Sequence, residues 1–146
     1  MVRFDINYKN DPMTDILGAA MLDYINGKYS ENIITESSIS EADEMPVPYL
    51  FRSYDEMPLI EQQALNLCKG TILDIGCGAG SHSLYLQEQR KLAVHAIDIS
   101  PGAIQTALHR GVKNATQQNY KEITKTYDTL LPVSYTHLTL PTICSV

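Results

Sequence analysis

The sequence predicts an α/β fold built on a parallel sheet. Two short apolar runs, at residues 71–75 and 92–97, have the composition of buried parallel strands. Each run is followed by a segment with helical apolar spacing, and glycines lie at the turns between them. Strands that alternate with helices form parallel sheets with right-handed crossovers. The 146 residues, 44% of them hydrophobic, suffice for one core.

Residues 1–70 are expected to form a helical cap in front of this sheet. Asp11 followed by Pro12 is typical of a helix N-terminus, and the helical spacing after it ends at Gly27, which predicts a helix of about four turns. Residues 31–61 carry eight acidic residues against one basic residue, and their prolines exclude a regular helix. We therefore predict a loop with a short ordered core at 49–51.

A second helix of the cap is predicted to begin at Pro58 and to end at Gly70. Residues 71–131 are expected to hold the sheet and its crossover helices. Strands are predicted at 71–75, 92–97, 115–118 and 127–131. One helix is predicted at 83–90. Another begins at the N-cap Ser100, where Pro101 suits the first turn, and ends before Gly111.

Residues 133–146 do not continue this pattern and contain no charged residue. Residues 133–142 resemble the translation of a transposase sequencing adapter in one reading frame. Such an adapter continues into a variable sample index and then a stop codon, which account for residues 143–146. The alternative is a genuine threonine-rich edge strand. We expect 132–146 to be a non-native tail and the authentic domain to be cut in its fourth strand, near Leu131. The natural protein is then expected to be longer.

A glycine-rich turn follows the first predicted strand. Asp74 precedes Gly76, Gly78 and Gly80, and glycines at such a turn let the backbone approach a ligand closely. Asp98 ends the next predicted strand, where a carboxylate can accept hydrogen bonds from two ribose hydroxyls. This order predicts an adenosine-type cofactor site at the carboxyl edge of the sheet. The alternative is a cluster of turn glycines without a ligand.

Two classes of cofactor compete for this site. A dinucleotide fingerprint requires Gly-x-Gly-x-x-Gly or Ala, whereas Gly80 comes one residue early and Ser81 stands at the expected position. Asp74 would repel a pyrophosphate, but it suits the ammonium group and the sulfonium field of an amino-acid cofactor. The motif therefore favours the amino-acid cofactor over a dinucleotide.

These residues resemble the first motif of class I S-adenosylmethionine-dependent methyltransferases, acid-x-Gly-x-Gly-x-Gly. The resemblance implies a Rossmann-like sheet with the strand order 3-2-1-4-5-7-6, here truncated after the fourth strand, and S-adenosyl-L-methionine as the cofactor. It implies cofactor contacts from Asp74, Gly76, Cys77, Gly78, Gly80, Asp98, Ile99 and Asn119. In this family the residue that ends the third strand, commonly Asp, contacts the adenine amino group; here Asn119 or Gln118 offers an amide oxygen that can accept that bond.

The resemblance implies methyl transfer from a sulfonium to an acceptor. Because this is an in-line displacement with a good leaving group, alignment of the nucleophile with the methyl group supplies much of the acceleration. In this family the residues that bind the methyl acceptor usually follow the fourth strand. The sequence therefore identifies no catalytic residue, and the acceptor, a small molecule or another compound, is not named. The alternatives are a non-catalytic cofactor-binding fragment and a NAD(P)-binding oxidoreductase.

Four residues of the cap allow two interpretations. They can close as a lid over the cofactor, as the front of this family often does, or they can simply pack in the core, which we favour. These residues are Tyr49, Phe51, Arg52 and Tyr54.

Three further side chains have both a chemical and a structural interpretation. Cys77 is either an activated nucleophile near a helix N-terminus or a small packing residue, and packing is favoured. His82 either lines the cofactor pocket or faces solvent in the first helical turn, and we favour solvent. His95 is expected to be a core or cross-strand histidine.

Composition excludes several other classes of function. Eleven basic against seventeen acidic residues give a net charge of -6, so nucleic acid is not an expected partner. No apolar run approaches the roughly 20 residues of a membrane span, and the N-terminus does not resemble a secretory signal. The three cysteines do not have the spacing of a disulfide framework or a zinc site. We expect a cytoplasmic protein.

Overall fold

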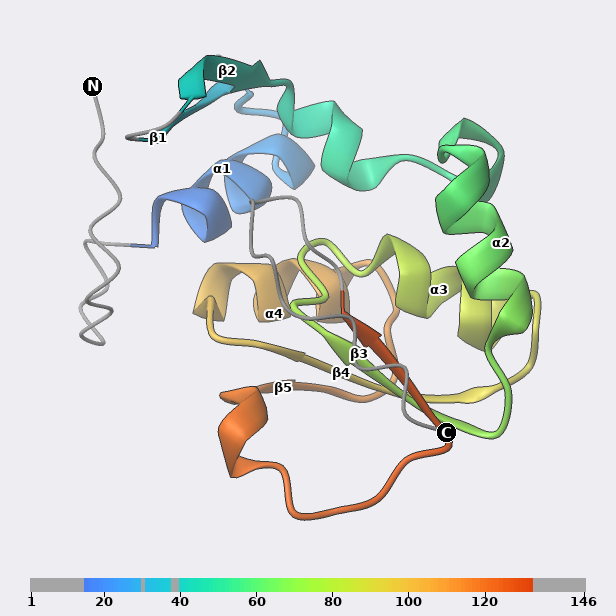
Figure 1. Cartoon of the computed structure of the whole chain (residues 1–146). Helices are drawn as coiled ribbons and strands as arrows, with labels where there is room; N and C mark the ends of the chain where they lie inside the picture. The colour runs from blue at the N-terminus through green and yellow to red at the C-terminus, as the bar shows by residue number, and fades with distance from the viewer. Residues whose placement is uncertain (1–14, 30, 38–39, 133–146) are drawn as a thin grey trace.

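The computed structural model describes residues 15–29, 31–37 and 40–132 (Figure 1). The cap contains α1 (Ile16–Ile25), β1 (Ile33–Ser37), β2 (Ser40–Met45), the 3₁₀ helices η2 (Val47–Phe51) and η3 (Tyr54–Glu56), and α2 (Leu59–Leu67). The remaining elements are β3 (Thr71–Ile75), α3 (Ser81–Glu88), β4 (Ala93–Asp98), α4 (Pro101–His109), β5 (Ala115–Gln117), η4 (Tyr120–Glu122) and β6 (Thr129–Pro132).

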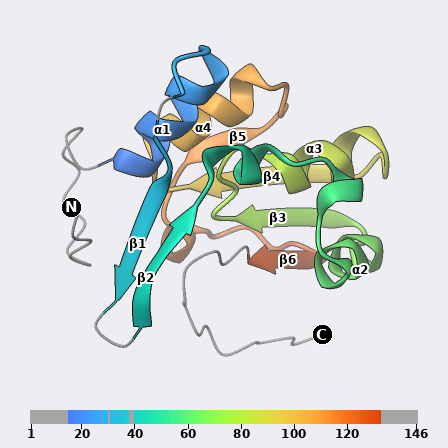
Figure 2. The ribbon, with the colours of Figure 1, turned by 90° about the horizontal axis from the view of Figure 1, so that it is seen from above.

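The main sheet has the strand order β5-β4-β3-β6, and every pair in it is parallel. Figure 2 shows β4, β3 and β6 side by side. This order corresponds to strands 3-2-1-4 of the order implied by the sequence, so the predicted Rossmann-like α/β class is confirmed. The β3-α3-β4-α4-β5 crossovers run in one direction, and right-handed crossovers of this kind place their helices on one face of the sheet. Figure 1 shows α3 and α4 on that face.

Two apolar clusters bind these helices to the sheet. One cluster joins Leu65 of α2 and Leu86 of α3 to Ile72 and Val94 of the strands. The other fills the space between β4 and α4. Its members are Cys77, Ala96, Ile104, Ala107 and Val112. Both helices are therefore fixed to the strands whose carboxyl ends carry the glycine turn and Asp98.

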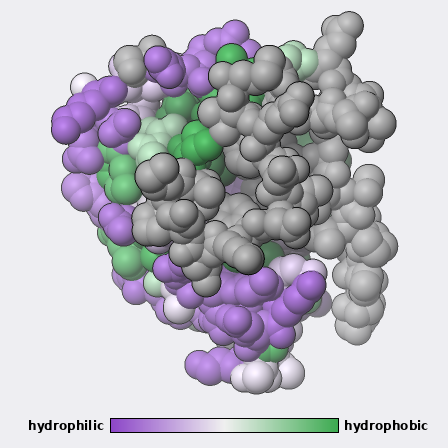
Figure 3. All heavy atoms as spheres, turned by 90° about the vertical axis from the view of Figure 1, so that its left-hand side faces the viewer, coloured by the Kyte–Doolittle hydropathy of each residue, from purple (hydrophilic) through white to green (hydrophobic). Residues whose placement is uncertain are grey.

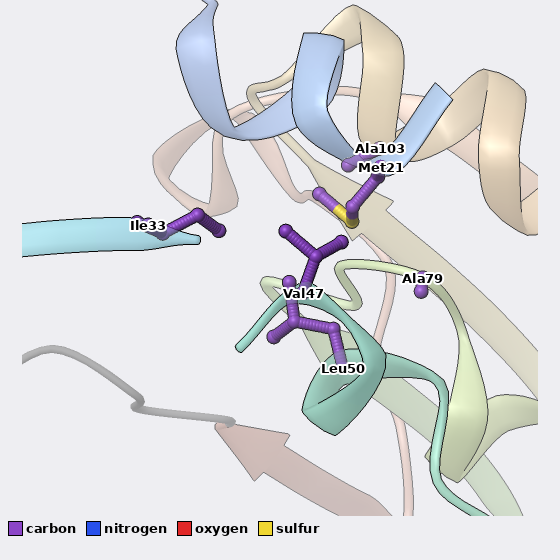
Figure 4. Close-up of a cluster of buried hydrophobic side chains, with 6 residues drawn as sticks. All are labelled: Met21, Ile33, Val47, Leu50, Ala79 and Ala103. Atoms are coloured by element: carbon purple, nitrogen blue, oxygen red, sulfur yellow. The ribbon is translucent and has the colours of Figure 1, made fainter. Parts of the chain in front are cut away.

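The cap has its own buried cluster, which reaches the carboxyl edge of the sheet. Figure 4 shows Val47 between Met21 and Leu50. Ala79 of the glycine turn and Ala103 of α4 complete the same cluster. Burial of these apolar groups therefore packs the cap against the part of the sheet domain where the predicted site lies.

Helix α1 crosses α4 at a contact between two glycines. A Cβ on Gly102 would lie 2.5 Å from the carbonyl carbon of Gly18, too close for any side chain. Figure 1 shows α1 stacked over α4, on the side away from the sheet. The crossing therefore depends on the missing side chain at Gly102.

The loop prediction for 31–61 is wrong over most of its first half. β1 and β2 form an antiparallel hairpin in which Ile33 lies opposite Met45. The prolines that argued against regular structure follow the hairpin, and a two-stranded ribbon can keep charged residues in solvent. The ordered core predicted at 49–51 is confirmed, because these residues belong to η2.

The first helix also begins later than predicted. Asp15 is its N-cap and accepts a hydrogen bond from the Gly18 N–H at 3.1 Å. The expected start, Asp11 and Pro12, lies outside the described residues, and Gly27 follows the helix end as predicted.

The other predicted helices and strands are present with small shifts at their ends. The helix expected at 83–90 is α3, which begins at Ser81 because Gly80 is its N-cap. β6 extends to Pro132, which pairs with Ile75 although the sequence interpretation placed it in the tail. The rest of that tail, 133–146, lies outside the described residues.

The segment between β5 and β6 crosses to the other side of β3 and carries η4. Lys121, Glu122 and Lys125 in this segment are exposed. Figure 3 shows a mostly hydrophilic surface at the lower end of the molecule, where η4 lies in Figure 1. None of the helices formed by residues 15–132, so far as they are described, has the length and apolar character that crossing a bilayer requires.

We expect Gly102→Ala to lower the free energy of unfolding by about 1–3 kcal/mol, because the new methyl group overpacks the α1–α4 crossing. The control is Gln105→Ala on the exposed side of α4, which should stay within about 0.5 kcal/mol of the wild type. Urea unfolding followed by circular dichroism measures both values. Equal stability of the two variants would show that the helices do not cross this closely.

Candidate cofactor-binding site

The predicted site residues meet where β3 and β4 end. The two strands pair with Ile75 opposite Ile97, so the glycine turn after β3 lies beside Asp98. The Gly78 N–H donates a hydrogen bond to Asp98 Oδ2 at 2.9 Å. Helix α3 begins directly after the turn, and α4 begins at Pro101, shortly after Asp98. The structure thus brings the glycine motif and the terminal acid together, as the sequence predicted.

The three glycines of the turn have different roles. All three have left-handed backbone angles, with φ of 72°, 53° and 80° at Gly76, Gly78 and Gly80. A Cβ on Gly80 would lie 2.7 Å from Val112 Cγ2, so this glycine is needed for packing within the protein. A Cβ on Gly78 would meet no atom of the described residues within 4 Å. Gly78 therefore marks the side of the turn that is open to a ligand.

Several amide groups of the turn donate hydrogen bonds within the protein. The N–H groups of Gly76 and Cys77 both donate to the Ile97 carbonyl, at 2.8 and 3.0 Å. The Gly78 N–H is bound to Asp98. A pyrophosphate at a glycine turn depends on such amide donors, and here these amides already have partners. These three amides are therefore not available to a pyrophosphate.

Asp98 holds two segments of backbone with its two carboxylate oxygens. Oδ2 accepts from Gly78, and Oδ1 accepts from the Ser100 N–H at 2.9 Å. Burial raises the pKa of Asp98, and the two amide bonds partly oppose this effect. Because each carboxylate oxygen has a second lone pair, both can still accept a hydrogen bond from a hydroxyl group.

Asp74 is fully buried, beneath the first turn of α3. Its Oδ2 accepts a hydrogen bond from Ser83 Oγ at 2.5 Å, whereas its Oδ1 has no partner among the described residues. Burial raises the pKa of Asp74; the Ser83 hydrogen bond opposes this effect, and the nearby Asp98 adds to it. A buried carboxylate oxygen without a donor is costly, so Asp74 is suited to a ligand with an N–H donor or a positive charge.

The favoured packing interpretation of Cys77 is confirmed. Its side chain is buried and belongs to the apolar cluster between β4 and α4. Burial and the neighbouring Asp74 and Asp98 carboxylates raise the pKa of the Cys77 thiol. A protonated, buried thiol is a weak nucleophile, so the structure contradicts the alternative of an activated cysteine.

Ile99 and the two amide candidates lie at the same edge of the sheet. The Ile99 side chain is 43% exposed, directly after Asp98. β5 ends at Gln117, and the next residue, Gln118, donates its backbone N–H to the Asp98 carbonyl at 3.0 Å. The amide oxygen of Asn119 accepts from the Lys121 N–H at 3.0 Å and thereby begins η4. Both candidates therefore remain near Asp98, and the oxygen of Asn119 has one protein partner.

The prediction that His82 faces solvent is wrong. His82 is buried, and its Nε2 lies 3.1 Å from Glu61 Oε2. The same carboxylate binds the buried Arg52 guanidinium, at 2.5 and 2.6 Å. This polar cluster joins two parts of the cap, the residue after η2 and helix α2, to the first turn of α3. The helical spacing around His82 did not indicate this burial, because its partner Glu61 lies 21 positions earlier in the sequence.

The core-packing interpretation agrees with the structure for Phe51, Arg52 and Tyr54, whereas Tyr49 is 39% exposed. The Tyr54 ring stacks on Tyr85 with ring centres 4.1 Å apart. The Phe51 ring packs against Tyr24 at 4.4 Å, and the Arg52 guanidinium lies 3.9 Å from the centre of the Tyr49 ring. Phe51 thus packs within the cap, and Tyr54 packs the cap against Tyr85 of α3.

Arg110 is a structural residue that sequence reasoning missed. Its guanidinium donates to the Ala79 carbonyl at 2.7 Å and to Ser81 Oγ at 2.9 Å, at the end of the glycine turn. It also donates to the Phe51 carbonyl of the cap at 3.4 Å. Arg110 therefore connects α4, the turn and the cap.

His95 is the cross-strand histidine that the sequence predicted. Its ring nitrogens lie 2.6 Å from the Tyr127 hydroxyl and 3.0 Å from Thr116 Oγ1. A hollow of about 430 Å³ is lined by these three residues and others at the opposite end of the strands. It contains none of the predicted cofactor-binding residues.

Comparisons with known proteins find methyltransferases. Residues 72–139 match the family described as methyltransferase domain. A SAM-dependent methyltransferase from Bacteroides fragilis, solved in complex with S-adenosyl-L-homocysteine, is 40% identical with a TM-score of 0.76, and the match covers 86% of this chain and 53% of that one. No curated protein matches the chain.

Two further solved structures match with lower identities and lower TM-scores. A magnesium protoporphyrin IX methyltransferase from Synechocystis PCC 6803, with bound SAH, is 20% identical with a TM-score of 0.43 and covers 58% of this chain and 50% of its own. A plantazolicin methyltransferase in complex with SAH is 22% identical with a TM-score of 0.43. The match covers 82% of this chain and 47% of that one.

The resemblance predicted from the glycine motif is therefore confirmed: the chain is similar to class I S-adenosylmethionine-dependent methyltransferases. It spans about half the length of the Bacteroides fragilis protein.

We expect Asp74→Asn to stabilise the protein at pH 7 by about 1–3 kcal/mol, because it removes a poorly satisfied buried charge. Since the folded-state pKa of Asp74 is raised, its favourable contribution is complete below the unfolded-state pKa and is lost as the pH rises through the folded-state pKa. The variant should therefore lose less stability than the wild type as the pH rises from about 4.

Urea unfolding at a series of pH values measures this difference. Asp23→Asn, an exposed carboxylate on α1, is the control and should keep the wild-type pH dependence. If Asp74→Asn keeps that dependence too, Asp74 does not carry a raised pKa.

Proposed function

We propose that this chain binds S-adenosyl-L-methionine at the carboxyl ends of β3 and β4 and forms the cofactor-binding half of a methyltransferase. The observation that carries the proposal is the turn that is open at Gly78 and bonded to the Asp98 carboxylate. Support comes from the Bacteroides fragilis protein, which is 40% identical and was solved with S-adenosyl-L-homocysteine.

The residues at this edge suit the parts of that cofactor. Asp98 has spare lone pairs for the ribose hydroxyls. Ile99 offers an exposed apolar side chain for the adenine ring, and Gln118 or Asn119 offers an amide. Asp74 supplies a buried negative charge and an unpartnered oxygen that suit an ammonium group. Gly76, Gly78 and Gly80 shape the turn, and Cys77 fixes its underside by packing.

The cofactor, when bound, supplies an electrophilic methyl group on a sulfonium. The chain's part is to hold the cofactor in one orientation and to provide the negative field of Asp74 and Asp98 around a positive charge. A base is needed only where the acceptor must lose a proton, and no residue of this site is assigned that role. The acceptor, a small molecule or another compound, belongs to the proposal for the longer protein.

The two alternatives are less well supported. An oxidoreductase needs a dinucleotide, whose glycine spacing this turn lacks, and the Gly76, Cys77 and Gly78 amides already donate to Ile97 and Asp98. The second alternative, a non-catalytic fragment, would bind the same cofactor at the same site. It differs from our proposal only in whether methyl transfer takes place. A cytoplasmic location stays a prediction from the sequence.

Replacement of Gly78 by Ala tests where the cofactor lies. The new Cβ meets no atom within 4 Å in the part of the chain that the structure describes, so its cost to stability is the backbone strain of a positive φ, about 1 kcal/mol. A cofactor against the turn would meet the methyl group, and we expect S-adenosylhomocysteine to bind at least about tenfold more weakly, a loss of about 1.4 kcal/mol.

Gly27→Ala is the matched control, since Gly27 also has a positive φ, 73°, and open space around it, but lies after α1. Isothermal titration of the full chain with S-adenosylhomocysteine compares the two variants. Equal affinities in Gly78→Ala and Gly27→Ala would place the cofactor away from the turn.

Asp98→Ala tests the ribose assignment. We expect S-adenosylhomocysteine to bind about 1–3 kcal/mol more weakly, because hydrogen bonds to a charged group are lost. Parallel titration with NAD identifies the class of cofactor. Unchanged affinity in the variant would refute the ribose role, and saturable binding of NAD without S-adenosylhomocysteine would overturn the methyltransferase proposal.

A further inference from the structure

Asp15 caps the N-termini of two helices at once. Its Oδ1 accepts from the Gly18 N–H of α1 at 3.1 Å and from Ser100 Oγ at 2.7 Å. Its Oδ2 accepts from the Gly102 N–H of α4 at 2.8 Å. Residues 15 and 102 are 87 positions apart in the sequence, so this carboxylate joins the cap to the sheet domain through three donors.

The contacts of Asp15 continue into the proposed cofactor site. Ser100 donates its hydroxyl to Asp15 and its backbone N–H to Asp98 Oδ1. Asp98 in turn accepts from the Gly78 N–H, on the open side of the turn. A continuous series of hydrogen bonds therefore runs from α1 through Ser100 and Asp98 to the glycine turn.

The packing around Asp15 leaves the helix few ways to shift. A Cβ on Gly18 would lie 2.5 Å from Ser100 Oγ, and a Cβ on Gly102 would lie 2.6 Å from Gly18 Cα. Helix α1 can thus reach Ser100 only because both helices have glycine at the crossing. Any movement of α1 along α4 would break the bonds of Asp15 to Ser100 and Gly102.

We propose that Asp15 is a positioning residue that couples the docking of helix α1 to cofactor binding, acting through Ser100 on Asp98. This inference rests on the proposed function and adds a residue that the glycine motif does not include. A ligand that holds Asp98 in its bound position favours the docked helix, and by linkage the docked helix favours the ligand to the same extent. Asp15 itself needs no contact with the cofactor.

The test combines binding with hydrogen exchange on the full chain. In the wild type, S-adenosylhomocysteine should slow amide exchange both in the glycine turn and in α1. In Asp15→Ala, affinity should fall about five- to fiftyfold, within the usual range of coupling between sites. The bound ligand should still protect the turn of this variant, but it should no longer protect α1.

Because Asp15 is also the N-cap of α1, Asp15→Ala can speed exchange in α1 both with and without ligand, so the readout is the change in α1 exchange between the free and the ligand-bound protein. Asp23→Ala is the control, because Asp23 lies exposed on the same helix, and it should match the wild type. Ser100→Ala removes the hydroxyl in the middle of the series and keeps the Ser100 N–H to Asp98. It should reproduce the loss of coupling even where Asp15→Ala folds poorly.

Each outcome has a distinct meaning. Weaker binding together with loss of α1 protection in Asp15→Ala and Ser100→Ala supports the inference. Wild-type affinity and α1 protection in both variants overturn it and leave the proposed function standing. No binding of S-adenosylhomocysteine by the wild type overturns the proposed function, and this inference fails with it.

Discussion

The carboxylate of Asp98 is the point on which the arrangement of this edge depends. Parallel pairing of β3 with β4 brings it beside the glycine turn, where it accepts the Gly78 N–H. Its other oxygen accepts from Ser100 at the start of α4. Turn, strand and helix are thereby held by one charged group, and charge-assisted hydrogen bonds of this kind are stronger than neutral ones. A site so fixed needs little reorganisation when a ligand arrives.

This arrangement has a cost in stability, because buried carboxylates are poorly solvated. Burial raises the pKa of both Asp74 and Asp98, which means that the folded protein disfavours their charged forms. Asp74 even keeps one buried oxygen without a protein partner in the described chain. Functional sites often retain such unfavourable groups, since a ligand of opposite charge recovers the lost interaction. The proposed cofactor, with its sulfonium and ammonium groups, is such a ligand.

The sequence was most informative where the determinants are local. The apolar runs of β3 and β4, the N-cap Ser100 and the glycine turn each depend on neighbouring residues, and all appear close to where they were predicted. The strand order followed from the family resemblance of that turn.

Sequence reasoning failed where a residue's environment comes from distant segments. The burial of His82 depends on Glu61 of α2, and the role of Arg110 depends on Phe51 of the cap. The first helix cap was predicted at Asp11 and not at Asp15, whose bonds to α4 cross 87 positions and leave no periodic signal. The hairpin was missed because the acidic composition of its segment obscured two short strands.

The topology explains why the cofactor site can be described apart from the acceptor. Strands β3, β4 and β5 follow one another outward in the sheet, and the residues proposed to contact the cofactor all lie on these strands or directly after them. The order of the strands then reverses, because β6 pairs in parallel with β3 on the side opposite to β4. Ligands of open α/β sheets bind where the strand order reverses. We therefore expect the cofactor to occupy the β4 side of this point and the acceptor to approach from the β6 side.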